Sequence, residues 1–128
     1  MPVFNHASLY VFDLNKSVHF YQSIIGFEMV PEPFKDGRHA WFSIGAGITL
    51  HIIEGAATAK DYYRSNHLCF SVASIENFMN LLRQHNISWE DSKGNPMAIT
   101  VRADDIQQIY FKDPDGYWIE INDDNKLC

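Results

Sequence analysis

The order of hydrophobic and polar positions along this chain predicts short strands and helices. Residues 4–12 alternate loosely between apolar and polar side chains and are rich in β-branched and aromatic residues, which indicates a strand. The following segment, residues 13–26, carries apolar side chains at helical spacing. Asp13 is the expected N-cap of this helix, and Gly26 is the expected residue just after its end. The chain therefore opens with a strand followed by a helix.

Three further strands are expected next, and the same order of elements then starts again. The three strands are FEMVPEP, HAWFSIG and ITLHIIEG, which are separated by proline and glycine. A polar linker, residues 55–65, precedes a new strand, NHLCFSV, and a helix from about Ser74 to His85. Four short stretches then read as strands: 87–91, 99–102, 108–112 and 117–121. The last two are joined by DPDG, in which proline sets φ and glycine takes the left-handed position.

The restart is an internal repeat. An offset of 61 residues aligns Asn5-His6 with Asn66-His67, and an offset of 69 aligns Leu50-His51-Ile52 with Ile119-Glu120-Ile121. The predicted fold is therefore α+β, with two βαβββ modules in a pseudo-twofold repeat that form a curved mixed sheet around a cleft. One domain, residues 1–128, would contain module one at about 4–54 and module two at about 66–123.

Four side chains in equivalent places of the repeat could bind a metal ion. His6 and His67 lie on the first strand of each module, and His51 and Glu120 on the last. Three imidazoles and one carboxylate suit Zn, Ni, Co, Mn or Fe and leave positions for water or substrate, as catalytic sites do. The other explanation is that three of the six histidines lie in strands by chance and that Glu120 is a solvated residue.

Alternation along the strands predicts which side chains border these four residues. Residues two positions apart on a strand share a face. The predicted neighbours are Ser8, Tyr10, Thr49, Ile53, Cys69, Ser71, Trp118 and Asn122. Of these, Tyr10, Thr49 and Trp118 are the preferred walls of a substrate site, although an aromatic residue in a strand also serves as core. Arg38 and Arg102 either clamp a substrate carboxylate or phosphate, or are solvated.

Charge and composition exclude several classes of function. The net charge is −6 and no basic stripe occurs, so a nucleic-acid partner is not expected. No apolar run approaches the roughly 20 residues that cross a bilayer, and no secretory signal is evident, so a cytoplasmic location is expected. Cys69 and Cys128 form neither a disulfide framework nor a CxxC pair.

Two long stretches carry a resemblance to a known superfamily. NHASLYVFDLNKSVHFYQSIIGFEMV and IYFKDPDGYWIEI resemble the opening and closing segments of the vicinal oxygen chelate superfamily, which includes glyoxalase I, fosfomycin-resistance thiol transferases, extradiol dioxygenases and bleomycin-binding proteins. The resemblance covers about residues 4–123 and is nearest to single-domain glyoxalase I-like proteins. It implies paired βαβββ modules around one divalent metal.

The resemblance also assigns roles to particular residues. His6, His67 and Glu120 fall where the superfamily places its metal ligands, and His51 falls on the position where glyoxalase I normally carries Glu. His51 is thus either a direct ligand or a group beside one. A single carboxylate leaves the ligated ion with a charge of about +1, which favours an anionic substrate and lowers the pKa of bound water.

The expected activity is that of a glyoxalase-type lyase or isomerase. Its substrate would be a small α-oxygenated compound or thiol adduct, with the metal stabilising an enolate-like oxyanion and Glu120 as the base. A homodimer is also implied, in which His6 and His51 of one chain meet His67 and Glu120 of the other. The alternatives are an extradiol-type dioxygenase, a fosfomycin-type thiol transferase and a non-catalytic ligand-binding module.

Overall fold

The chain folds into two compact units, which the computed structural model describes over residues 1–124. The first unit comprises Met1–Lys60, and the second begins at Asp61. This boundary lies within the segment 55–65, where the structure has neither helix nor strand. Cys128 lies outside the described residues. No helix within residues 1–124 has the length and apolar character needed to cross a membrane.

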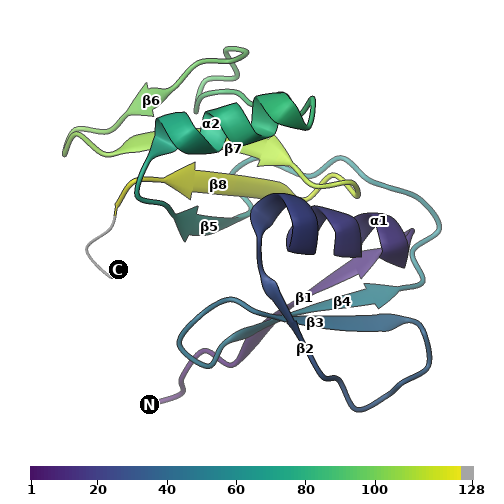
Figure 1. The fold of residues 1–128 in the computed structure, drawn as a ribbon. Helices are drawn as coiled ribbons and strands as arrows, with labels where there is room; N and C mark the ends of the chain where they lie inside the picture. The colour runs from purple at the N-terminus through teal and green to yellow at the C-terminus, as the bar shows by residue number, and fades with distance from the viewer. Residues whose placement is uncertain (125–128) are drawn as a thin grey trace. The chain divides into compact units, whose positions relative to one another are not determined.

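The first unit contains a four-stranded mixed sheet (Figure 1). Its strands are β1 (His6–Val11), β2 (Glu28–Val30), β3 (His39–Ser43) and β4 (Thr49–Glu54). They lie in the order β1-β4-β3-β2. The first and last strands of the module pair in parallel, and the remaining neighbours are antiparallel. β1 is therefore an edge strand.

The second unit repeats this arrangement. Its strands are β5 (His67–Ser71), β6 (Thr100–Val101), β7 (Gln107–Lys112) and β8 (Trp118–Asn122). The order β5-β8-β7-β6 and the parallel pairing of β5 with β8 match the first unit strand for strand. The prediction of an α+β fold from two βαβββ modules is confirmed. Strand pairing stays within each unit, so the mixed sheet consists of two separate four-stranded parts over the described residues.

The helix of the first unit begins and ends where the sequence predicts. It runs as α1 (Leu14–Val18) and continues as a wider π-helical segment, η1 (His19–Ile25). The Asp13 carboxylate accepts a hydrogen bond from the Lys16 amide at 3.2 Å, as an N-cap does. Gly26 closes the helix with φ of 93°, a left-handed conformation that glycine adopts without steric cost.

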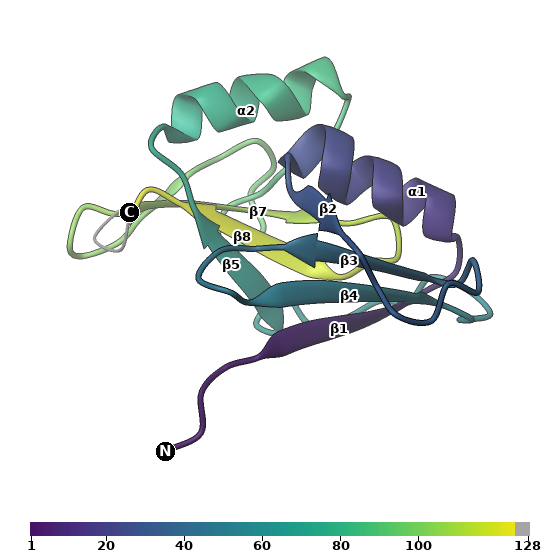
Figure 2. The ribbon, with the colours of Figure 1, turned by 60° about the horizontal axis from the view of Figure 1, so that its bottom comes forward.

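The second unit carries one longer helix, α2 (Ile75–Gln84). Ser74 is its N-cap, because the Ser74 hydroxyl accepts a hydrogen bond from the Asn77 amide at 3.1 Å. The last helical residue is Gln84 and the C-cap is His85, so the helix ends where the sequence predicts. Figure 2 shows α2 lying over one face of the sheet that contains β7 and β8. Since its apolar residues recur at helical spacing, α2 covers the core of this unit.

Replacing the Ser74 cap by alanine is expected to destabilise the protein by about 1 kcal/mol, because one amide at the start of α2 loses its acceptor. Urea denaturation of Ser74→Ala beside the wild type measures this difference. Ser74→Asp is the matched control, since its carboxylate can accept the same hydrogen bond and should retain stability. Equal losses in both variants would contradict a capping role for Ser74.

Each sheet has one face covered by its own helix and one face without a helix. In the first unit the covered face packs the buried residues Val11, Phe42, Leu50 and Ile52 with Phe20, Tyr21 and Ile24. In the second unit the covered face packs Ile109, Phe111, Ile119 and Ile121 with Ile75, Phe78, Met79 and Leu82. Because side chains alternate along a strand, the neighbouring positions lie on the opposite face. We call that opposite face the open face of each unit.

The prediction of a strand over 87–91 is wrong. Only Glu90 takes part in a bridge, with Tyr110 on one side and Pro96 on the other. The pairing cannot extend, because the Asp91 carboxylate accepts hydrogen bonds from the amides of Lys93 and Asn95 and turns the chain. The apolar signal in this stretch comes from Trp89, which is buried.

Candidate functional site

The strand registers put the four candidate ligands in equivalent positions of the two units. On the parallel strand pair of the first unit, Ser8 pairs with His51, and His6 lies two residues before Ser8. In the second unit Cys69 pairs with Glu120, and His67 lies two residues before Cys69. In both units these side chains fall on the open face, since the residues between them are part of the core.

In the first unit, the imidazoles of His6 and His51 stack on each other with ring centroids 4.1 Å apart. The indole of Trp41 stacks on the other side of the His51 ring at 3.9 Å. The Thr49 hydroxyl lies 2.8 Å from Nε2 of His51. The pKa of His51 is lowered by desolvation of its ring and then by the neighbouring His6 and His39. His51 is accordingly biased toward the neutral form, which is the form that binds metals.

His6 and His67 are each oriented by a hydrogen bond to Nδ1. Nδ1 of His6 lies 2.7 Å from the Asn5 side-chain oxygen, and Nδ1 of His67 lies 2.8 Å from the Arg64 carbonyl oxygen. Both partners are acceptors, so the proton of a neutral ring is on Nδ1 and the lone pair is on Nε2. Metal-binding histidines are commonly oriented in this way by a carbonyl or carboxylate.

In the second unit, Nε2 of His67 faces Oε1 of Glu120 at 3.2 Å. Two ligand atoms about 2 Å from one tetrahedral Zn-like ion lie roughly 3.3 Å apart, so this spacing suits a pair of ligands. Without a metal the same contact is an ion pair when His67 is protonated. Glu120 is only 5% exposed.

Side chains around Glu120 favour its charged form. Burial alone would raise its pKa, but hydrogen bonds from Cys69, Tyr110, Gln108 and Asn122 outweigh burial and lower it. Desolvation, followed by the hydrogen bond to Glu120, raises the pKa of Cys69 to about 12 and that of Tyr110 to about 12. Glu120 is thus a carboxylate surrounded by neutral donors.

The four candidate side chains carry the kinds of ligand atom that divalent cations bind. They occur as one pair of candidate ligands in each unit. His6 and His51 form the first pair, and His67 and Glu120 form the second. Imidazole nitrogens with one carboxylate oxygen are ligands for borderline divalent ions. Within residues 1–124, no group of three or more His, Cys, Asp or Glu side chains could by itself hold a metal ion.

Two of the predicted wall residues, Thr49 and Trp118, lie next to candidate ligands, since Thr49 contacts His51 and Trp118 pairs with His67. Tyr10 is exposed on β1, and Thr49 contacts His51 directly. The Trp118 indole donates a hydrogen bond to the Tyr62 carbonyl at 2.9 Å. The guanidinium of Arg64 lies 5.8 Å from the centroid of the Trp118 ring, and the Lys112 ammonium lies 5.1 Å from it. Cations on its ring and a hydrogen bond on its nitrogen hold Trp118 in place.

Arg38 and Arg102 are both engaged within the protein. The Arg38 guanidinium donates two hydrogen bonds to the Glu54 carbonyl oxygen, at 2.9 and 3.2 Å. The Arg102 guanidinium donates to both carboxylate oxygens of Asp104. A substrate anion would have to compete with these contacts.

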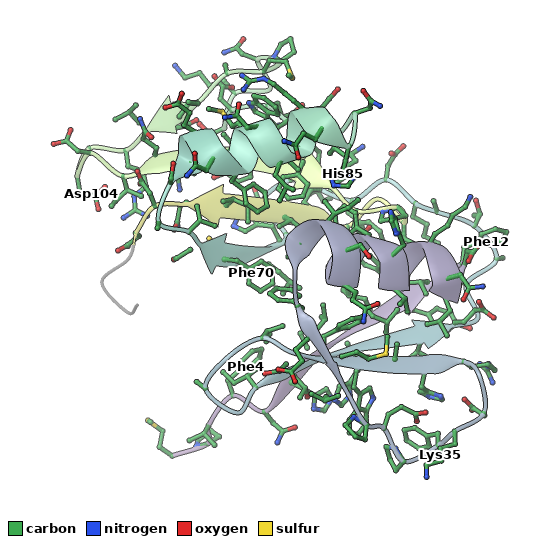
Figure 3. All side chains as sticks on the ribbon, viewed as in Figure 1. Phe4, Phe12, Lys35, Phe70, His85 and Asp104 are labelled. Carbon is green, nitrogen blue, oxygen red and sulfur yellow. The ribbon has the colours of Figure 1, made fainter. Side chains whose placement is uncertain are left out.

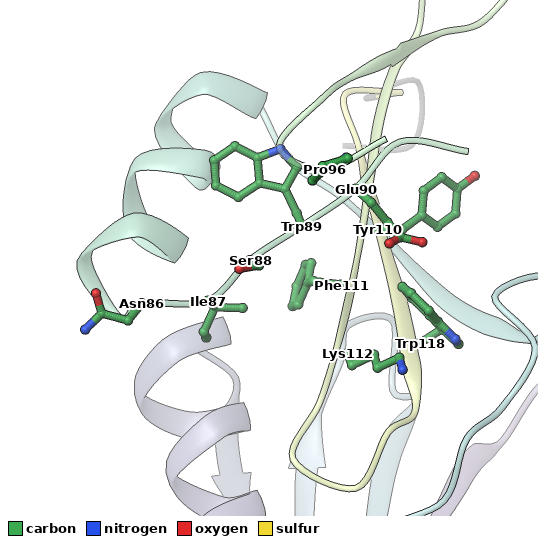
Figure 4. Close-up of a pocket in the computed structure, with 10 residues that line it drawn as sticks. All are labelled: Asn86, Ile87, Ser88, Trp89, Glu90, Pro96, Tyr110, Phe111, Lys112 and Trp118. Atoms are coloured by element: carbon green, nitrogen blue, oxygen red, sulfur yellow. The ribbon is translucent and has the colours of Figure 1, made fainter. Parts of the chain in front are cut away.

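A hollow of about 450 Å³ lies beside β7 in the second unit (Figure 4). Tyr110 and Trp118, which flank Glu120 in the sheet, line it together with Lys112 and Glu90. Its volume is in the range of small-molecule sites. Tyr110, Lys112 and Trp118 share the open face with Glu120, whereas Phe111 lies on the covered face. Neither His67 nor Glu120 lines the hollow.

Sequence reasoning missed three residues on the open faces. Gln108 and Tyr110 donate to Glu120, and Trp41 stacks on His51. All three lie on the third strand of their module, whereas alternation was applied only to the first and last strands. The offset of 69 residues relates Trp41 to Tyr110 and would have identified this position.

Comparison with known proteins gives matches along nearly the whole chain. The family model of the Glyoxalase/Bleomycin resistance protein/Dioxygenase superfamily matches residues 3–121. A lactoylglutathione lyase of Pseudomonas putida is 28% identical over 93% of this chain and 83% of its own length. The metallothiol transferase FosB of Staphylococcus saprophyticus is 27% identical, covering 92% of this chain and 74% of that protein.

Solved structures show the same fold. The fosfomycin resistance protein FosX of Listeria monocytogenes superposes with a TM-score of 0.74 at 24% identity, covering 95% of this chain and 93% of the other. At this identity the likeness concerns the fold alone.

Proposed function

Because this chain belongs to the Glyoxalase/Bleomycin resistance protein/Dioxygenase superfamily, we propose that it is a metal-dependent enzyme of the glyoxalase type. The observation that carries the proposal is the equivalence of the two ligand pairs: His6 with His51, and His67 with Glu120, occupy matching register positions. Members of this superfamily typically use a divalent metal. A pair of ligands repeated by the fold is the arrangement expected if both pairs serve one ion.

The proposed ligands are His6, His51, His67 and Glu120. For His6 and His67 the Nδ1 hydrogen bonds support ligation through Nε2. For His51 a metal would replace the Thr49 hydroxyl at Nε2, or His51 would act beside the metal through its contact with His6. When bound, the cation supplies Lewis-acid stabilisation of negative charge on adjacent substrate oxygens.

The proposed chemistry is a proton shift in a small α-oxygenated substrate or a thiol adduct. Glu120 is the base that moves the proton between neighbouring carbons, since it is the one carboxylate among the proposed ligands. His51 is oriented by Thr49 and Trp41, and it keeps the net charge of the ligands at −1. Tyr10, Thr49 and Trp118 are proposed to bound the substrate, and Arg38 or Arg102 to contact an anionic group on it.

Thiol transfer is the second candidate reaction. Its support is that the relatives include metallothiol transferases as well as a lactoylglutathione lyase. Both reactions use a thiol compound, so assays with a hemithioacetal and with a thiol plus an electrophile separate them.

A homodimer is proposed as the assembly that completes the site. In it, His6 and His51 of one chain and His67 and Glu120 of the other would share one metal. The edge strand β1 supports a protein contact, because the exposed aromatic residue Tyr10 lies on it and the exposed Phe4 and Phe12, labelled in Figure 3, lie just before and after it.

Elemental analysis of the purified protein tests the metal proposal. The wild type is expected to hold about one divalent ion per chain, and His6→Ala is expected to hold much less because a ligand is lost. His19→Ala is the matched control, since His19 is exposed on η1 and should have no effect. If the wild type takes up no Zn, Ni, Mn or Fe(II) even when these are added, the enzyme proposal fails and a ligand-binding module becomes the better account.

A further inference from the structure

We propose that Cys69, Gln108 and Asn122 are positioning residues that hold one oxygen of Glu120, so that only the other oxygen is offered to metal and substrate. This inference rests on the proposed function, because it concerns how Glu120 acts as a ligand and base. It adds an assignment for three side chains that touch neither metal nor substrate in that proposal.

All three side chains donate to the same carboxylate oxygen. Oε2 of Glu120 accepts hydrogen bonds from the Cys69 thiol at 3.1 Å, the Gln108 amide at 3.0 Å and the Asn122 amide at 3.1 Å. A carboxylate oxygen offers about two lone-pair sites. Three donors therefore leave Oε2 no capacity for a further strong partner.

The orientation of Asn122 is itself determined by its surroundings. Its side-chain oxygen accepts hydrogen bonds from the Ser71 hydroxyl at 3.0 Å and from the Asp124 amide at 3.1 Å. With the oxygen engaged by two donors, the amide nitrogen is turned toward Glu120. Rotating the Asn122 amide would place donors against donors, so this contact resists rearrangement.

Oε1 of Glu120 accepts none of these three hydrogen bonds. It faces Nε2 of His67 at 3.2 Å, and His67 is oriented by the Arg64 carbonyl. Nε2 of His67 and Oε1 of Glu120, which the proposed function assigns to the metal, therefore face each other. Oε2, which the three donors hold, is not available to the metal. The carboxylate cannot rotate to exchange its oxygens without breaking three hydrogen bonds.

The first unit has no such set of donors around His51. Positions 39 and 53, which correspond to Gln108 and Asn122, are His39 and Ile53. Trp41, which corresponds to Tyr110, stacks on the imidazole instead of donating to it. The residues of each open face thus match the ligand that they surround. Aromatic rings stack on the His51 imidazole in the first unit, and hydrogen-bond donors bind the Glu120 carboxylate in the second.

Titration with Co²⁺, followed by its visible absorption, tests the inference. Gln108→Ala and Asn122→Ala are each expected to weaken Co²⁺ binding by about tenfold to a hundredfold and to change the absorption bands. Cys69→Ala should weaken binding, and Cys69→Ser should restore it, because a hydroxyl can donate to the same oxygen. Gln107→Ala is the matched control, since Gln107 precedes Gln108 on β7 and faces the other side of the sheet.

Thermal unfolding of the metal-free variants separates positioning from general stability. Gln108→Ala should unfold close to the wild type while its Co²⁺ spectrum changes. If Glu120→Gln loses Co²⁺ binding but the Gln108, Asn122 and Cys69 variants keep wild-type affinity and spectra, the inference is wrong and the proposed function stands. If the wild type binds no Co²⁺, both are overturned.

Discussion

Glu120→Gln is expected to lower turnover on the best substrate by about a hundredfold to ten-thousandfold, the range for loss of a general acid or base. The substitution keeps the shape of the side chain but removes its charge and one acceptor. Its amide nitrogen would have to face either the three donors at Oε2 or Nε2 of His67. In the first orientation donors face a donor, and in the second the nitrogen replaces the oxygen that is proposed to bind the metal.

Steady-state kinetics together with metal content distinguish the two roles of Glu120. Loss of metal and of turnover together identifies a ligand, whereas loss of turnover with metal retained identifies a base. Glu76→Gln is the matched control, because Glu76 is exposed in the first turn of α2 and should leave both quantities unchanged. Wild-type turnover and metal content in Glu120→Gln would contradict both roles.

Phe111→Ala is expected to destabilise the protein by about 3–5 kcal/mol, the usual cost of removing a buried phenylalanine side chain. Phe111 is 1% exposed and lies 5.8 Å from Phe78 of α2, measured between ring centroids. Deleting the ring leaves a cavity between helix and sheet that the neighbouring residues fill only in part. Against a typical total of about 5–15 kcal/mol, this is a large fraction of the stability.

Phe42→Ala makes the equivalent change in the first unit and should cost a similar amount, because Phe42 is fully buried at the matching position of β3. Urea denaturation followed by tryptophan fluorescence measures both, with Trp41 in one unit and Trp89 and Trp118 in the other as probes. Gln22→Ala, at an exposed position of η1, is the control. Losses below about 1 kcal/mol would contradict the assigned cores.

Much of the fold followed from local signals in the sequence. Asp13 and Gly26 bounded the first helix, and Ser74 the start of the second, because caps and left-handed glycine act on their immediate neighbours. The offsets of 61 and 69 residues predicted two modules of the same strand order. They also singled out His6, His67, His51 and Glu120, because matching positions of a repeat have the same place in each unit.

Contacts between strands that are distant in sequence were decided by the tertiary structure alone. Gln108 and Tyr110 reach Glu120 only because β7 pairs with β8 in one particular register. The same applies to Trp41 and His51 on β3 and β4. The guanidinium of Arg38 donates a hydrogen bond to the Glu54 carbonyl oxygen, and no local sequence pattern predicts this contact.

The sequence by itself therefore determined the order of elements and which residues are equivalent, since both depend on short-range periodicity and on repetition. It did not determine which oxygen of Glu120 is held, or that His51 lies between two rings. These features depend on side chains that meet across a sheet, where a shift of one residue in register would turn each of them to the opposite face.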